Sequence, residues 1–288
     1  MRDQNETKLA LGTVQFGLNY GISNVCGKTE EKEVVNIIET AWQNGIDTID
    51  TARGYGDSEG VLGKTLRHPF RIVTKFPVSA DTPQKIEQSL RASLKALGTE
   101  NAYGFLAHDA DILIKCPELW KMLVGLRKKK VVEKIGFSLY KPEQLKRLIE
   151  LGILPDIVQF PYNFLDQRFK PFFQKLKSMG VEIYARSVFL QGLFFMKPCQ
   201  LSIHFESLKP LLKRLQLELP DKDDLAAWLV QFVLKEKDID KIVIGVNNSQ
   251  QLKAILSGLL NQYSISVDTD TNIPEELLMP NLWPQNIQ

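Results

Sequence analysis

Cysteine is scarce in this 288-residue chain: Cys26, Cys116 and Cys199 are the only three, and they lie far apart. Such spacing gives neither a disulfide framework nor a set of metal ligands, so no metal site is predicted. It is typical of a reducing, intracellular compartment. No apolar run approaches 18 residues, which argues against a membrane partner, and the polar N-terminus MRDQNETKLA lacks the core of a signal peptide. We therefore expect a cytoplasmic protein.

An excess of charge of one sign is also missing, since 36 Lys and Arg stand against 34 Asp and Glu. Without a general basic field, no nucleic-acid partner is expected. The one dense basic cluster covers residues 127–130 and reads RKKK. We interpret it as a solvated helix end, where cations suit the helix dipole. The sequence gives no indication of the oligomeric state.

A Gly-x-Gly-x-x-Gly turn does not follow the first expected strand. Residues 12–17 read GTVQFG, and their two glycines have the wrong spacing for a dinucleotide-binding turn. A Rossmann dehydrogenase is therefore disfavoured.

Short β-like runs alternate with longer amphipathic runs along most of the chain. The expected strands cover residues 9–11, 46–50, 71–75, 103–108, 134–138, 156–160, 182–187 and 241–245. The expected helices cover residues 31–44, 58–66, 83–97, 142–151, 169–179, 223–235 and 250–260. Eight repeated strand–helix units favour an α/β fold with parallel strands, closed into a (β/α)8 TIM barrel. Because no low-complexity linker divides the chain, we expect one barrel domain over residues 1–288.

Two segments exceed what a plain barrel needs. The stretch 191–220 is long for one connection, and we expect a loop with an extra helix after the seventh strand. Four of its side chains either line a substrate pocket or pack the insertion onto the barrel; they are Phe194, Phe195, Met196 and His204. The tail beyond residue 261 is expected to be non-helical except near 274–278, with Trp283 anchoring it across the barrel.

Four groups that can do chemistry stand at or just after the ends of expected strands: Asp50, Tyr55, Lys75 and His108. A parallel barrel gathers such strand ends on one face. A tyrosine is a poor acid because its ordinary pKa is about 10. The ammonium of Lys75, held in place by Asp50, is expected to lower the pKa of Tyr55 and make it a general acid or base.

In the same hypothesis His108 orients a carbonyl oxygen by a hydrogen bond. The set holds no obvious nucleophile, so the electrons for a reaction must come from elsewhere. Taken singly, each residue has a structural interpretation as a loop cap, a strand end or a packed side chain. Their common placement at strand ends favours a functional site.

The order Asp50, Tyr55, Lys75, His108, with DTARGYGDSE around the tyrosine, resembles the aldo-keto reductases. The resemblance extends from Leu9 to about Leu260. It implies hydride transfer from a nicotinamide cofactor to an aldehyde or ketone, or the reverse oxidation of an alcohol, with sugars among the candidates. It also implies that Tyr55 is the proton donor.

The resemblance further implies that an extended cofactor lies over the C-terminal face of the barrel. Gly12 and Thr13 would contact it after the first strand, beside Asp50. The carboxamide of the nicotinamide would take hydrogen bonds from Ser138 and Gln159. The loop on the pyrophosphate side would include Ser187, Phe189, Gln191 and Gly192. The adenosine side would be held by Gly245, Asn247, Asn248 and Gln251, at a helix N-terminus that favours a phosphate.

These positions also have plainer interpretations. Gln159 suits a barrel-interior residue, Gly192 suits a turn, and Asn248 suits a helix N-cap.

The chain departs from the family pattern at three places. Leu139 stands where an asparagine is common, and Arg186 stands where an aromatic residue is common. A guanidinium can stack on a ring, so we expect Arg186 to cover the nicotinamide face. At the adenosine end, Gly245 and Gln251 stand where members selective for NADPH often carry a Lys or Arg pair. NADPH is therefore expected only because it is common in the family, and NADH remains the alternative.

Two alternatives remain beside a carbonyl reductase. One is a cofactor-binding regulatory subunit of the same fold with little turnover. The other is a barrel lyase or isomerase that uses Lys75 as a Schiff-base amine. A small-molecule carbonyl substrate is expected for the reductase, and an apolar or sugar-stacking rim is indicated by Phe16, Tyr20, Phe164 and Phe194.

Overall fold

The computed structural model describes residues 7–267 and 273–284 of the chain. Eight parallel strands pair in chain order and close into a barrel, in which β8 returns to pair with β1. They are β1 Leu9–Gly12, β2 Thr48–Asp50, β3 Arg71–Phe76, β4 Ala102–Ala107, β5 Val132–Ser138, β6 Ile157–Pro161, β7 Glu182–Arg186 and β8 Lys241–Gly245. The predicted (β/α)8 barrel is confirmed, and every expected strand is present with its ends shifted by at most two residues.

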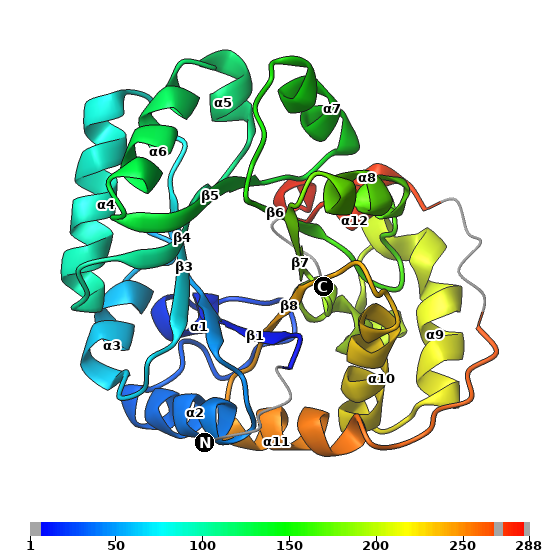
Figure 1. Ribbon diagram of the computed structural model, residues 1–288. Helices are drawn as coiled ribbons and strands as arrows, with labels where there is room; N and C mark the ends of the chain where they lie inside the picture. Colours follow the sequence, from blue (N-terminus) through cyan, green and yellow to red (C-terminus); the bar gives the residue numbers. More distant parts are fainter. Residues whose placement is uncertain (1–6, 268–272, 285–288) are drawn as a thin grey trace.

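Helices form a ring outside the strands (Figure 1). The α-helices are α1 Val14–Gly17, α2 Glu31–Gln43, α3 Ser58–Thr65, α4 Pro83–Leu97, α5 Asp111–Lys115, α6 Leu119–Lys128, α7 Pro142–Glu150, α8 Phe173–Ser178, α9 Lys209–Glu218, α10 Lys222–Leu234, α11 Ser249–Gly258 and α12 Glu275–Leu278. Short 3-10 helices are η1 Lys170–Phe172, η2 Leu190–Phe195, η3 Pro198–Gln200, η4 Ile203–Leu208 and η5 Pro280–Leu282. The basic run 127–130 does lie at a helix end, since α6 ends at Lys128.

Helix α4 illustrates how local sequence sets these elements. The side chain of Thr82 caps its first turn by accepting a hydrogen bond from the Lys85 amide, and Pro83 follows at the first helical position. Gly98 ends it in a left-handed conformation with φ 67°. The stripe that includes Leu90 and Leu94 is buried against the barrel, and each such side chain contributes about 1.5–3 kcal/mol to folding.

The hydrophobic core has two parts. The larger lies between the strands and the ring of helices, and the smaller fills the barrel interior with Val73, Leu106, Ile157 and Tyr184. Gly136 on β5 is required by this interior, because a Cβ there would overlap the carbonyl oxygen of Ile157. The packed interior leaves the strand ends as the place for chemistry.

The expected insertion after β7 contains η2, η3, η4 and the extra helix α9. Its side chains divide between the two roles considered for them. Phe194 and Met196 are buried in the core, whereas Phe195 lines a cavity. The ring of His204 packs on Phe205, and its buried Nε2 has no partner.

The described part of the tail reaches this insertion. Trp283 stacks edge-on against Phe205 of η4 at 5.0 Å, and its indole nitrogen donates to the Leu277 carbonyl. Glu275 forms ion pairs with Lys141 and Arg168, which follow β5 and β6. The tail is thus tied to loops at the carboxyl ends of the strands.

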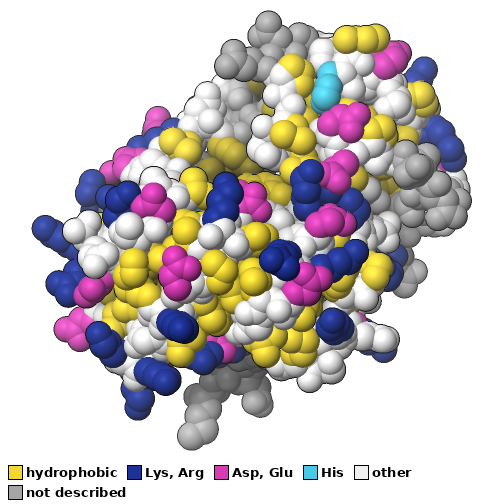
Figure 2. All heavy atoms as spheres, turned by 90° about the horizontal axis from the view of Figure 1, so that it is seen from above, with side chains coloured by type: hydrophobic (Ala, Val, Ile, Leu, Met, Phe, Trp, Pro, Cys, Tyr) yellow, Lys and Arg dark blue, Asp and Glu magenta, His cyan; other side chains and the backbone are white. Residues whose placement is uncertain are grey.

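Positive and negative side chains alternate over the face in Figure 2, and neither sign forms a broad patch there. Within residues 7–267 and 273–284, no helix has the length and apolar content needed to cross a membrane.

Candidate active site

A cavity of about 420 Å³ opens where the carboxyl ends of the strands meet. Gly12 of β1, Asp50 of β2, Ser138 of β5 and Gly245 of β8 all line it. Its volume lies in the range of about 300–1,000 Å³ that is usual for small-molecule and cofactor sites. The barrel therefore concentrates polar groups on the face that the sequence predicted.

The floor of the cavity contains a buried ion pair. Lys75 donates from Nζ to both carboxylate oxygens of Asp50, at 2.7 and 2.6 Å, and to the Thr51 carbonyl at 3.0 Å. Gln159 donates from Nε2 to the same carboxylate at 2.7 Å. Asp50 faces the cavity, whereas Lys75 is fully buried and does not line it. Burial lowers the pKa of Lys75, and the charge of Asp50 opposes that shift.

Tyr55 and His108 lie together above this pair. Their rings meet edge to face with centroids 5.4 Å apart, and Lys75 Nζ lies 5.3 Å from the centroid of the tyrosine ring. Both aromatic side chains line the cavity. Tyr55 is held by the loop between β2 and α3, where its amide donates to the Ala52 carbonyl. All four groups named from the sequence are therefore neighbours.

One expectation about these groups is wrong. The pKa of Tyr55 is raised above its ordinary value, chiefly by burial and then by the negative charge of Asp50, while Arg186 lowers it. The cation of Lys75 does not reverse this shift, because its charge is balanced by the carboxylate that it contacts. Tyr55 therefore keeps its proton at neutral pH and is poised as a proton donor.

His108 is also uncharged at neutral pH. Burial, followed by the charges of Lys75 and Arg186, lowers its pKa to about 3. A neutral imidazole has one N–H donor and one acceptor nitrogen. His108 can therefore hydrogen-bond an oxygen in the cavity without adding charge to it.

Arg186 lies at the end of β7 and is held on several sides. Its guanidinium carbon is 4.4 Å from the centroid of the Tyr140 ring. It donates from Nε to Ser138 Oγ at 3.3 Å, from Nη1 to Ser187 Oγ at 3.1 Å and from Nη2 to the Leu139 carbonyl at 2.9 Å. The stacking partner in this structure is Tyr140, and stacking on a nicotinamide stays a prediction.

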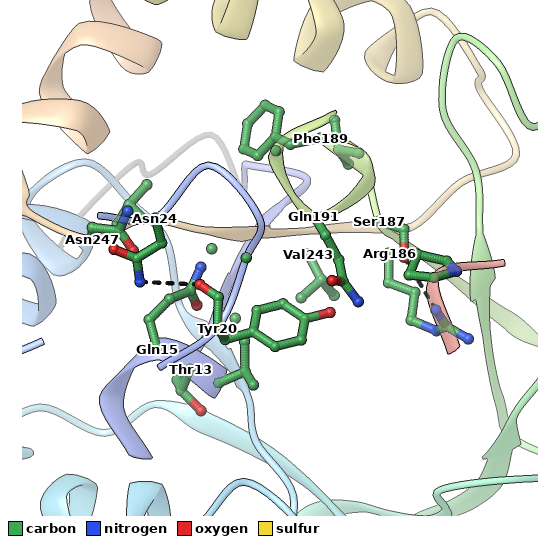
Figure 3. Close-up of a pocket in the computed structure, with 18 of the residues that line it drawn as sticks. Thr13, Gln15, Tyr20, Asn24, Arg186, Ser187, Phe189, Gln191, Val243 and Asn247 are labelled. Atoms are coloured by element: carbon green, nitrogen blue, oxygen red, sulfur yellow. Dashed lines mark hydrogen bonds between the residues drawn. The ribbon is translucent and has the colours of Figure 1, made fainter. Parts of the chain in front are cut away.

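Most of the predicted cofactor-binding residues share the cavity lining: Gly12, Thr13, Asp50, Ser138, Gln159, Arg186, Ser187, Phe189, Gln191, Gly192, Gly245, Asn247 and Gln251. Asn248 is not part of that lining. Its side-chain oxygen instead accepts from the Gln251 amide and caps α11. Figure 3 shows Arg186 and Ser187 on one side of the cavity and Asn24 and Asn247 on the opposite side, with Tyr20 and Gln191 between them.

The loop that follows β7 has an unusual backbone. Ser187, Leu190 and Gln191 adopt positive φ angles of 60°, 43° and 53°. Such conformations are costly for residues other than glycine and concentrate at functional sites. The Gln191 carbonyl accepts from the Ile22 amide, which ties this loop to the segment carrying Tyr20.

The lining has features that fit a dinucleotide. Gln15 Oε1 and Asn247 Oδ1 are buried oxygens with no hydrogen-bond partner, and both residues line the cavity. A Cβ on Gly245 would lie 2.6 Å from Gln15 Nε2, so a larger residue there would displace the Gln15 amide. Unpaired buried acceptors are costly unless a ligand satisfies them. The residues present therefore suit an extended polar ligand.

The expected aromatic rim is mostly wrong. Phe16, Phe164 and Phe194 are buried in the core, and Phe164 packs on Trp228 with ring centroids 4.9 Å apart. Of the four proposed residues only Tyr20 lines the cavity. Burial raises its pKa to about 12.

Several lining residues were not predicted from the sequence, among them Gln15, Tyr140 and Lys222. Tyr140 follows Ser138 by two residues at the end of a strand, so the strand-end rule could have found it. Lys222 begins α10 and had no comparable signal. Within the described ranges, no cluster of His, Cys, Asp and Glu has the arrangement of a metal site.

Comparison with known proteins identifies the family. Residues 8–268 match the model of the aldo/keto reductase family. Methylglyoxal reductase DkgA of Salmonella typhimurium is 32% identical over 169 residues, a match that covers 56% of this chain and 59% of that protein. The matched region is thus less than two thirds of that relative's length.

Two solved structures share the fold. An aldo-keto reductase of Bacillus halodurans in its holo form superposes with a TM-score of 0.73 at 19% identity, covering 99% of this chain and 97% of that one. A glycerol dehydrogenase of Gluconobacter oxydans superposes with a TM-score of 0.68 at 18% identity, covering 91% and 89%. Together with the family match over nearly the whole sequence, these likenesses lead to one conclusion: this chain belongs to the aldo/keto reductase family.

Proposed function

We propose that residues 1–288 form one domain that reduces an aldehyde or ketone with NAD(P)H, or oxidises the corresponding alcohol. The observation that carries this proposal is the cluster at the floor of the cavity. Tyr55 and His108 face the cavity directly above the buried Asp50–Lys75 pair. A protonated phenol and a neutral imidazole are suited to an oxygen atom that gains negative charge.

In this proposal each of the four catalytic residues has one task. His108 donates a hydrogen bond that orients the substrate carbonyl. Tyr55 gives its hydroxyl proton to the carbonyl oxygen as that oxygen becomes an alcohol. Lys75 then stabilises the phenolate, and Asp50 keeps Lys75 in place. General acid catalysis of this kind contributes roughly 10²–10⁴ in rate.

A reduced nicotinamide dinucleotide, when bound, supplies the hydride. We assign its nicotinamide end to Ser138, Gln159 and Arg186, and its other end to Gly245, Asn247 and Gln251. Gln159 and Ser138 already bond to Asp50 and Arg186, so they are preorganised for this task. The free acceptors of Gln15 and Asn247 are available to the ligand's hydroxyl groups.

NADPH is the proposed form, with NADH as the competitor. The cavity lining near α11 is neutral at Asn247 and Gln251, so a 2′-phosphate needs a cation from another element. Lys222, at the start of α10, lines the same cavity together with Ala226 and with Ile255 of α11. We assign the contact with the 2′-phosphate to this lysine.

A titration tests the proposal directly. The purified protein is mixed with NADPH and, separately, with NADH, and nicotinamide fluorescence is followed. Saturable binding is expected for NADPH, and a panel of aldehydes and ketones should then oxidise the bound cofactor. Failure to bind either dinucleotide would contradict the proposal.

The same experiment separates the alternatives. A regulatory subunit would bind a dinucleotide tightly and turn over no carbonyl compound. A Schiff-base enzyme would become covalently labelled when an aldehyde and borohydride are added together. The burial of Lys75 and its contacts with Asp50 and Thr51 count against that chemistry, because the amine does not reach the cavity.

A further inference from the structure

Arg186 is a cation in the cavity wall without a matching anion. Its three hydrogen bonds go to two hydroxyl groups and a backbone carbonyl, all of them neutral. Among the described residues, no carboxylate lies within ion-pair distance of its guanidinium. In contrast, the half-buried Arg168 is paired with Asp166 at 2.8 Å. A partly buried charge is costly unless a partner compensates it.

Arg186 has two unused N–H donors, which matches the two oxygens of a carboxylate. A guanidinium has five N–H groups, one on Nε and two on each terminal nitrogen. The three contacts use one hydrogen on each nitrogen. One N–H therefore remains on Nη1 and one on Nη2, and such a pair can hold two oxygens of one carboxylate.

The rest of the catalytic cluster does not neutralise this charge. Asp50 and Lys75 compensate each other through their two short contacts. His108 carries no charge at neutral pH, and Tyr55 keeps its proton. The reaction site therefore has a net positive charge, which comes from Arg186.

The guanidinium is also held in a fixed position. The face of Tyr140 lies against it at 4.4 Å, and the bonds to Ser138 and Leu139 reach the end of β5, on the far side of β6. Because the side chain is already ordered, little rotamer entropy remains to be lost when a ligand binds. The position is thus preorganised rather than a mobile surface arginine.

We propose that Arg186 binds a carboxylate group of the substrate, so that the preferred substrates are aldehydes or ketones that also carry a carboxylate. This inference rests on the proposed function, since it concerns the same cavity and the same reaction. It gives Arg186 a role in substrate specificity. The face of the guanidinium stays available for stacking, because the carboxylate binds along its edge.

A matched pair of aldehydes tests the inference. 4-Carboxybenzaldehyde and 4-formylbenzamide have nearly the same shape and differ in the charge of one group. With saturating dinucleotide, the wild-type protein should show a kcat/KM about 10-fold to 100-fold higher for the carboxylate, mainly through KM, as charge-assisted hydrogen bonds provide. In Arg186→Gln the ratio should fall to within about 3-fold of one; the amide serves as the internal reference, because any effect of the substitution on the cofactor changes the rates of both aldehydes alike.

A control variant separates local from general electrostatics. Arg147 on α7 is exposed, pairs with Glu150 and is absent from the cavity lining. Arg147→Gln removes the same charge and should keep the wild-type preference for the carboxylate. Loss of the preference in this variant as well would overturn the inference, because the effect would then come from net charge.

Binding without turnover gives a second readout. In the presence of dinucleotide, benzoate should bind to the wild-type protein at least about 10-fold more tightly than benzamide, measured by calorimetry. This comparison uses only the wild-type protein, so it does not depend on whether a variant folds. Equal binding of the two, or equal turnover of the two aldehydes by the wild type, would overturn the inference while leaving the reductase proposal intact. Absence of dinucleotide binding would overturn both.

Discussion

Lys75 donates to both carboxylate oxygens of Asp50, and both side chains are buried. Removing one charge of such a pair leaves the other buried and uncompensated, which is far more costly than losing an exposed ion pair. The contact therefore matters for the fold as well as for the proposed reaction.

We expect Lys75→Met to destabilise the protein by about 3–5 kcal/mol, because Asp50 then keeps a buried charge that only Gln159 contacts. Urea unfolding followed by circular dichroism measures this change. Lys85→Met, which breaks the exposed pair with Asp81, should cause a much smaller loss. The double variant Asp50→Asn with Lys75→Met should be more stable than Lys75→Met alone, and a further loss of stability would contradict the account.

The rate of carbonyl reduction should be nearly independent of pH between about pH 5 and pH 9. The pKa of His108 is lowered to about 3, so the imidazole stays neutral throughout this window. The pKa of Tyr55 is raised above its ordinary value, so the phenol stays protonated and the rate should fall only at more alkaline pH. Steady-state kcat measured across the window checks this. A fall in rate centred near pH 6.5 would show that His108 titrates there.

Lys222→Gln should weaken binding of NADPH by about 5-fold to 10-fold and leave the binding of NADH nearly unchanged. The reason is that only NADPH brings a 2′-phosphate to the part of the cavity that Lys222 lines. Fluorescence titration with each dinucleotide gives the two dissociation constants. If Lys222→Gln weakens the binding of both dinucleotides equally, or weakens neither, then Lys222 does not contact the 2′-phosphate.

The sequence predicted the barrel and its catalytic face for a definite reason. Parallel strands bring their carboxyl ends to one edge, so Asp50 and His108 could be expected to meet although 58 positions separate them in the sequence. Ser138, Gln159 and Gly245 were expected at one site because of the resemblance to the aldo-keto reductases, and all three line the cavity.

What the sequence could not predict depends on packing. The direction of the Tyr55 pKa shift was missed because burial outweighs a cation that already has a partner. Phe16 and Phe164 were assigned to the cavity, yet both lie in the core, since an aromatic side chain near a strand end can turn either way. Lys222 follows a long insertion, and no local pattern links it to the strand ends.

The most direct test of the central claim is turnover by Tyr55→Phe. This variant keeps the ring that packs beside His108 and removes only the hydroxyl group that is proposed to donate the proton. We predict a loss of about 10²–10⁴ in kcat for carbonyl reduction, with dinucleotide dissociation constants within about 2-fold of the wild type. Near-normal turnover by Tyr55→Phe would contradict the assignment of Tyr55 as the general acid.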